Sequence, residues 1–186
     1  MWTQPKALPQ QANDVLPNGQ VSQLPVEGTV ARGRFKEDEG FHTGFRNGKM
    51  LKELPATLVI DGEKLSTTND LGKILERGKD RFDIFCTHCH GALGDGKGMI
   101  AKRGLELRRP PATYHTDRLR EMPIGHFFDV QTKGYGAMFS YASRIEPNDR
   151  WAIAAYIRAL QLSQNATGED LPAGGANGGQ PQEGGN

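Results

Sequence analysis

The sequence has little cysteine, no long apolar run and almost no net charge, and each of these shortages excludes something. Its two cysteines have no second cysteine and histidine cluster beside them, which a structural zinc site with its usual set of about four ligands requires. No run of about 18 apolar residues is present, so no segment is predicted to cross a membrane as a helix. The net charge is +1, which gives no argument for nucleic-acid binding.

Apolar residues are scarce as well, which predicts that part of the chain is not packed. Hydrophobic residues make up 36% of the chain, against about 45–50% in a typical globular domain, and there are 24 Gly and 11 Pro. We divide the chain into an extended, partner-binding arm at 1–66, a folded domain at 67–164 and a disordered Gly-rich tail at 165–186. The start of the arm, 1–30, is polar and studded with proline, and it shows neither a helical nor an alternating period.

The rest of the arm holds three aromatic residues with two possible uses. Phe35, Phe41 and Phe45 either pack locally on the folded domain or are buried in a partner subunit. Residues 54–60 predict one short strand that ends at Asp61-Gly62.

One short stretch carries the clearest chemical signal. Cys86-Thr87-His88-Cys89-His90 reads C-x-x-C-H, the attachment signature of a c-type haem. Two thiols three positions apart at the end of a helix can each form a thioether with one of the two vinyl groups of a porphyrin. The histidine that follows is then held beneath the iron as its proximal ligand. We therefore expect one covalently attached haem c, held by Cys86 and Cys89, with His90 on the iron.

Other interpretations of this stretch fit less well. A zinc site lacks further ligands, because His42, His115 and His126 are scattered along the chain. A thioredoxin-like redox pair needs a β-α-β pattern around it, whereas the flanking residues predict helices. A disulfide across a two-residue gap would be strained and labile.

Helical periodicity surrounds the motif. Apolar or small residues recur in steps of three and four from Leu71 to Phe85, after the start signal Thr68-Asn69-Asp70, and predict one helix. A last helix is expected at about 147–162, with small residues that allow it to cross the first helix closely at Gly78. Shorter helical segments are expected at 99–107, at 117–122 and at 123–134.

The glycine-rich segment 91–98 that follows the motif is not predicted to bind a nucleotide, because a helix precedes it and not a strand. We expect a flexible turn over the edge of the haem. Pro110-Pro111 ends the next short helix, and one of these proline carbonyls is expected to accept a hydrogen bond from the imidazole of His90.

Basic residues gather near this segment. Residues 67–164 hold 15 Lys and Arg against 11 Asp and Glu. Lys102, Arg103, Arg108 and Arg109 form either an ordinary solvated face or a docking patch for an acidic partner.

The second axial position of the iron has five candidates, Met99, Met122, Met138, His115 and His126. Met99 is too close to His90 to reach the opposite face of the haem easily. Met138 lies between two predicted helices, and the glycines near it let the backbone approach the ring, so we expect it to be the second axial ligand. A thioether there favours electron transfer, whereas an open position favours the binding or activation of small molecules. His126 is expected to be a surface or packing residue.

Two sets of residues resemble known families. Gly78-Lys79-Asp80-Arg81-Phe82 before the motif and Ala155-Tyr156-Ile157 in the last helix resemble a class I cytochrome c over residues 68–164. In that family the first and last helices cross at the glycine and aromatic residues pack there, and Phe82 and Tyr156 match those positions. The resemblance implies an all-α fold, here with a long and mostly irregular N-terminal arm.

Four further segments resemble the mono-haem cytochrome c subunit of alternative complex III, a bacterial membrane assembly that oxidises quinol and carries iron–sulfur clusters and several c haems. They lie at 26–33, 91–100, 125–130 and 149–156. Two departures stand out. Phe139 occupies a position where many c-type cytochromes have proline, and the arm lacks the lipidated cysteine typical of these subunits.

The second resemblance implies an electron-transfer subunit and not an enzyme in its own right. Its partners would be the other subunits of the membrane complex, including a multi-haem cytochrome, and its electrons would pass to a terminal oxidase or a soluble carrier. It would lie on the periplasmic side of the bacterial inner membrane. Thioether attachment of haem takes place on the outer side of the bacterial membrane, which requires a leader, but no apolar run is visible at 1–11. We therefore expect that a leader precedes residue 1, where the resemblance also implies a lipid anchor.

Two rival functions stay open at this stage. The first is a free periplasmic electron shuttle, against which the 66-residue arm argues. The second is a haem enzyme or gas sensor with an open sixth position, which rapid binding of carbon monoxide to the ferrous protein would reveal.

Overall fold

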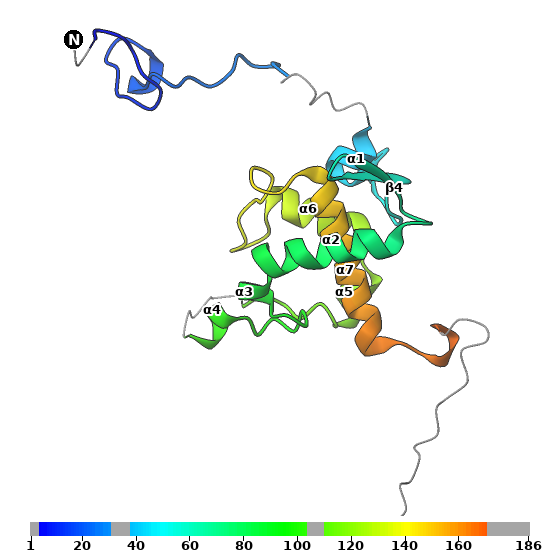
Figure 1. Ribbon diagram of the computed structural model, residues 1–186. Helices are drawn as coiled ribbons and strands as arrows, with labels where there is room; N and C mark the ends of the chain where they lie inside the picture. The colour runs from blue at the N-terminus through cyan, green and yellow to red at the C-terminus, as the bar shows by residue number, and fades with distance from the viewer. Residues whose placement is uncertain (1–3, 31–37, 104–109, 171–186) are drawn as a thin grey trace, which may run out of the picture. The chain divides into compact units, whose positions relative to one another are not determined.

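The computed structural model describes residues 4–30, 38–103 and 110–170 (Figure 1). The chain forms two compact units, Met1–Glu37 and Asp38–Asn186. In the described part of the first unit, a 3-10 turn η1 (Pro17–Gly19) is closed by an isolated bridge between Ala12 and Gln20. This segment shows neither α-helix nor extended sheet, as its proline-rich composition predicts.

The second unit is built around two crossing helices. Helix α2 (Leu71–Phe85) crosses helix α7 (Pro147–Asn165), as Figure 1 shows. The backbones are in close contact at Gly78, where an added Cβ would lie 2.1 Å from the carbonyl oxygen of Ala152. Beside it the rings of Phe82 and Tyr156 meet edge to face, with their centroids 5.4 Å apart. The predicted helices and their crossing at the glycine are therefore confirmed.

The shorter helices follow the predictions in part. Pro123 was expected to start the third helical segment, but it is the residue before the helix, with an extended ψ of 151°. The bounds are α3 (Thr87–His90), α4 (Met99–Lys102), α5 (Asp117–Glu121) and α6 (Ile124–Lys133). The helix expected at 99–107 is therefore described only as α4, because residues 104–109 lie outside the described part.

Residues 38–66 hold a short helix and two antiparallel hairpins. The bounds are α1 (Glu39–Thr43), β1 (Phe45–Arg46), β2 (Lys49–Met50), β3 (Thr57–Ile60) and β4 (Glu63–Ser66). Strand β1 pairs with β2, and β3 pairs with β4. The strand expected at 54–60 corresponds to β3, which is shorter than expected and is paired with β4. Asp61 and Gly62, both with positive φ, form the tight turn that joins the two strands.

The boundary of the folded unit differs from the predicted one. Leu58 and Leu65 are fully buried in the hydrophobic core, and Phe41, Leu51 and Leu54 pack against it. Segment 38–66 therefore belongs to the compact unit, which begins at Asp38 and not at residue 67, because its apolar side chains are covered by the helices.

Two of the three aromatic residues of this region pack locally. Phe41 lies against the core, and Phe45 is half-buried beneath the amino group of Lys133, 5.1 Å from the ring centroid. Phe35 lies outside the described residues.

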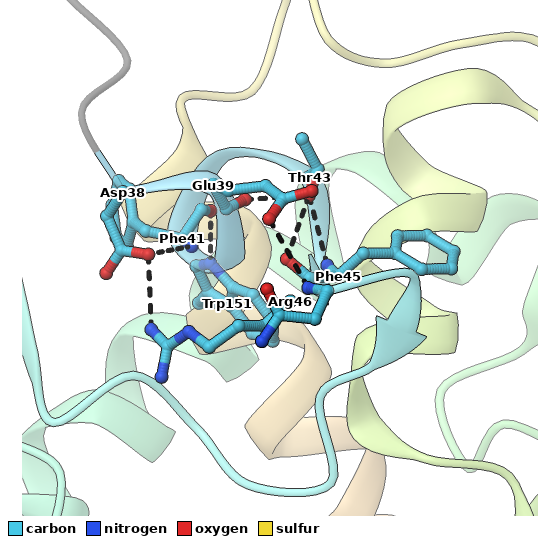
Figure 2. A network of polar contacts seen from close by, with 8 residues as sticks. Asp38, Glu39, Phe41, Thr43, Phe45, Arg46 and Trp151 are labelled. Atoms are coloured by element: carbon cyan, nitrogen blue, oxygen red, sulfur yellow. Dashed lines mark hydrogen bonds and ion pairs between the residues drawn. The ribbon is translucent and has the colours of Figure 1, made fainter.

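A polar network fixes segment 38–46 on α7, as Figure 2 shows. The buried indole of Trp151 donates a hydrogen bond of 2.8 Å to the carbonyl of Phe41. Asp38 accepts from the amide of Phe41 and from the guanidinium of Arg46, each at 3.2 Å. Trp151 also stacks on Phe128, with a centroid distance of 4.3 Å. The indole therefore joins the first residues of the unit to its central helix.

Replacing Trp151 with Phe should lower the free energy of unfolding by about 2 kcal/mol, since the Phe41 carbonyl loses its donor and a small void opens. Denaturant unfolding measures this. In the same network, Arg46→Met removes only an exposed ion pair and should change stability by less than about 1 kcal/mol. Equal, small effects of both changes would contradict the role given to Trp151.

The expected all-α class is correct for the helices of the second unit, and the two hairpins are an addition to it. In the described ranges, none of the helices has both the length and the apolar character needed to cross a membrane. Helix α7 continues to Asn165, and a 3-10 turn η2 (Gly168–Asp170) follows it. The rest of the predicted tail, residues 171–186, lies outside the described part.

Candidate haem site

The motif continues α2 through a tight turn. The amide of Cys86 donates to the carbonyl of Phe82 at 2.8 Å, and the amide of His90 donates to the carbonyl of Cys86 at 2.9 Å. Cys86 and Cys89 are three positions apart on this helical backbone, and residues so spaced lie on the same face. The two thiols and the imidazole therefore lie within a single helical turn.

Both thiols are free and resist ionisation. Burial raises the pKa of Cys86 to about 12 and also raises the pKa of Cys89. None of the described residues form a group of three or more metal-ligating side chains. The two thiols therefore lack the further ligands that a structural zinc site needs.

The imidazole of His90 is held neutral. Burial, followed by the neighbouring charge of His88, lowers the pKa of His90 to about 4. Its Nδ1 atom is buried and has no hydrogen-bond partner. A neutral imidazole is the form that ligates iron.

The hydrogen bond expected between His90 and a proline carbonyl is not formed. Since Nδ1 of His90 has no partner, neither Pro110 nor Pro111 accepts from it. The carbonyl of Pro111 lies instead against Gly96, where an added Cβ would be 2.4 Å from the oxygen. The Pro111 carbonyl is therefore packed against the glycine loop.

Tyr114 is a neighbour of His90 that the sequence did not reveal. Its ring stacks on the imidazole, with centroids 4.9 Å apart and an angle of 16° between the planes. It also lies near Phe82 and Phe127, at 6.3 and 6.1 Å. Burial raises the pKa of Tyr114, which keeps the phenol neutral. Tyr114 follows Pro110-Pro111 with no periodic pattern, so no signal in the sequence pointed to it.

The glycine loop is folded tightly on the motif. Gly96 donates to the carbonyl of His90 at 2.8 Å, and Gly98 donates to the carbonyl of Cys89 at 3.2 Å. A Cβ at Gly98 would lie 2.4 Å from the carbonyl oxygen of His88. The glycines therefore allow backbone to lie on backbone. The flexible turn that the sequence predicted is in fact bonded to the motif.

Met138 lies in the loop between α6 and α7. Gly134 starts the loop with a φ of +83°, and an added Cβ there would lie 2.4 Å from the carbonyl oxygen of Met138. Tyr135 and Met138 exchange two backbone hydrogen bonds, of 2.9 and 3.0 Å, which close a tight turn. In Figure 1 the loop extends toward the same side of the unit as the end of α2 that bears the motif.

Tyr141, in the same loop, packs against the hydrophobic core, as does Cys86 of the motif. Burial raises the pKa of Tyr141, which keeps the phenol neutral. The core therefore supports both the loop that carries Met138 and the motif that carries the thiols.

Of the four other candidate ligands, one is hydrogen-bonded elsewhere, one is exposed and two are half-buried. A ring nitrogen of His115 lies 2.7 Å from the carbonyl oxygen of Leu93. His126 is half-buried on α6, with its ring edge to face with Phe127. Met99 is exposed, and Met122 is half-buried, with its carbonyl accepting from the guanidinium of Arg158.

A cavity of about 560 Å³ lies beside the motif and is lined in part by His88 and Met99. Lys97, Lys102 and Arg103 line it together with Asp83. Two members of the predicted basic patch thus border this cavity, while Arg108 and Arg109 lie outside the described residues.

A scan against protein families matches residues 74–157 to the family described as cytochrome C oxidase, cbb3-type, subunit III. These residues form a cytochrome c domain. Such a domain carries a covalently attached haem c, transfers electrons, and at this size holds one haem. The thiols, the neutral imidazole and the aromatic residues around them fit that group.

Two solved structures are distantly similar to the cytochrome c domain. The first is a reducing HAO-like protein complex of Kuenenia stuttgartiensis, at 21% identity and a TM-score of 0.40, which covers 47% of this chain and 44% of that chain. The second is cytochrome cL of Hyphomicrobium denitrificans, at 16% identity and a TM-score of 0.37, which covers 57% of this chain and 73% of that chain. This chain therefore spans less than half the length of the first relative. A search of the curated proteins finds no match.

Proposed function

We propose that Cys86 and Cys89 hold the haem through thioethers and that His90 and Met138 are its two axial ligands. The observation that carries this proposal is the single helical turn at the end of α2 that brings both thiols and the half-buried, neutral imidazole of His90 together. The loop that carries Met138 extends toward the same side of the unit as the motif, which supports the second axial ligand (Figure 1).

The haem supplies reversible one-electron chemistry at its iron. The chain's own residues keep the site dry and its ligands in place. Phe82 is fully buried, and Tyr114 covers one face of the imidazole. With both axial positions filled by side chains, small molecules are kept off the metal, which suits electron transfer and not catalysis.

We further propose that the chain is a subunit of a membrane-associated, quinol-oxidising respiratory assembly of the alternative complex III kind. It would receive electrons through a multi-haem cytochrome partner and pass them to a terminal oxidase or a soluble carrier, on the periplasmic side of the inner membrane. Apart from the resemblance, support comes from the first unit. The apolar side chains of Val15, Leu24 and Val26 are 91%, 88% and 83% exposed there. Exposed apolar side chains that lie together are typical of a protein-binding surface.

Purification in mild detergent, followed by mass analysis of the intact associated subunits, tests this membership. The chain should appear with a multi-haem cytochrome. A Leu24→Glu, Val26→Glu variant should dissociate from it, whereas the control Ser22→Glu, Gln23→Glu should not. A wild-type chain that is recovered only as a monomer would favour the free shuttle.

Replacing Met138 with Ala should abolish the weak long-wavelength absorption of thioether-bound ferric haem and open the iron to carbon monoxide, because the second axial bond is lost. Absorption spectra of the oxidised and reduced protein measure both effects. Met99→Ala, at an exposed methionine, is the matched control and should leave both unchanged. A band that survives in Met138→Ala would make Met122 the better candidate.

A further inference from the structure

The base of the Met138 loop is tied to one residue of α6, Thr132. The hydroxyl of Ser140 donates to the carbonyl of Thr132 at 2.6 Å and accepts from the amide of Ala142 at 3.2 Å. The hydroxyl of Thr132 donates in turn to the carbonyl of Phe128 at 2.7 Å. Thr132 therefore fixes the loop two residues beyond Met138.

Arg150 of α7 holds Thr132 from the other side. Its guanidinium donates to the hydroxyl of Thr132 and lies over the ring of Phe128, 4.7 Å from the centroid. Arg150 is only 5% exposed, and burial lowers its pKa. Its positive charge lies near the C-terminal end of α6, where the helix dipole is negative and stabilises a cation.

Gln131 forms a second set of hydrogen bonds that links the Met138 loop, α6 and α7. Its backbone carbonyl accepts from the amide of Tyr141 at 2.9 Å. Its side-chain amide donates to the carbonyls of Phe127, at 3.0 Å, and Arg150, at 3.3 Å. Ser140 and Tyr141, which follow Met138, are therefore both anchored on residues that α7 holds in place.

We propose that Arg150 and Thr132 are positioning residues for the second axial ligand: together with Ser140 they hold the loop so that the Met138 thioether stays on the iron. This inference rests on the proposed role of Met138. None of the three residues is assigned a contact with the haem. Their effect reaches the iron through the backbone of the loop.

Mutation of a residue that supports a metal ligand typically lowers metal affinity or activity by about 10- to 100-fold. We expect an effect of this size here. If the loop is released, the thioether leaves the iron more often, and carbon monoxide binds in its place. Ser140→Ala and Thr132→Val should therefore each speed carbon monoxide binding by about 10- to 100-fold and weaken the long-wavelength band. Thr132→Ser, which keeps the hydroxyl, should restore both to the wild-type values.

The pairing of Arg150 with Thr132 is tested by combining changes. Arg150→Met removes the donor but keeps an unbranched side chain over Phe128. If Arg150 acts through Thr132, the double variant Arg150→Met, Thr132→Val should bind carbon monoxide no faster than the stronger single variant. If the double variant instead binds carbon monoxide faster by the product of the two single increases, Arg150 does not act through Thr132.

A matched control separates positioning from general stability. Thr67 donates to the carbonyls of Pro55 and Ala56, away from the loop, so Thr67→Val loses similar hydrogen bonds. It should leave the spectrum and the binding rate unchanged. Ser140 is exposed, so Ser140→Ala remains folded even if Thr132→Val does not.

The decisive comparison places Ser140→Ala beside Met138→Ala. A band lost in Met138→Ala and weakened in Ser140→Ala supports the inference. A band lost in Met138→Ala with spectrum and rate unchanged in both Ser140→Ala and Thr132→Val overturns it and leaves the proposed function intact. A band unchanged in Met138→Ala overturns both.

Discussion

Gly78→Ala is expected to destabilise the folded unit by about 2 kcal/mol or more, although alanine is the better helix former. The added methyl would lie 2.1 Å from the carbonyl oxygen and 2.7 Å from the carbonyl carbon of Ala152. These are backbone atoms of α7, so the two helices must separate to admit it. Overpacking of this kind costs about 3 kcal/mol, of which about 1 kcal/mol is offset by the gain in helix propensity.

Gly72→Ala is the control, because it is the same chemical change on the same helix. Nothing lies within 4 Å of a Cβ added at Gly72. This variant should be as stable as the wild type or up to about 1 kcal/mol more stable. Thermal or denaturant unfolding of the two variants isolates the steric overlap. Equal stability of the two would show that α2 and α7 do not cross closely at Gly78.

His90→Ala should remove the proximal ligand completely while the haem stays attached. The thioethers at Cys86 and Cys89 do not depend on the imidazole, so the denatured polypeptide should keep its colour. The low-spin spectrum should be lost because one axial nitrogen is missing. Added free imidazole should restore it, since the side chain is replaced by a small ligand of the same chemistry.

His88→Ala is the matched control, two positions earlier in the same turn. His88 lines the cavity beside the motif, with Lys97 and Met99, and is not proposed as a ligand. Its loss should leave the low-spin spectrum unchanged. A normal spectrum in His90→Ala, or its loss in His88→Ala, would mean that the wrong histidine has been assigned to the iron.

The helices could be predicted because their signals are local. The apolar steps from Leu71 to Phe85 gave α2 with both ends correct, and the small residues of α7 indicated its close crossing at Gly78. The segment 38–66 could not be placed in the same way. Its buried residues, such as Leu58 and Leu65, are few and interrupted by glycine and proline, so their burial depends on distant helices and not on a local period.

The residues of the site divide in the same way, into those with a local signal in the sequence and those without one. Cys86, Cys89 and His90 are adjacent in the chain, so the spacing alone predicted their common turn. Tyr114 and Arg150 come from distant segments, and no pattern in the sequence indicates that they meet His90 and Thr132. The expected bond from a proline carbonyl to His90 was wrong, because the spacing in the chain does not fix where these segments pack: His90 Nδ1 has no partner, and the Pro111 carbonyl lies against Gly96.

The central claim is that Cys86 and Cys89 hold a porphyrin covalently. The most direct measurement is extraction of the denatured protein with acidified organic solvent, which removes a haem held by axial bonds alone. We predict that the colour stays with the polypeptide and that its mass exceeds that of the bare chain by one haem. Colour that passes into the solvent, or a polypeptide with the mass of the bare chain, would contradict the account.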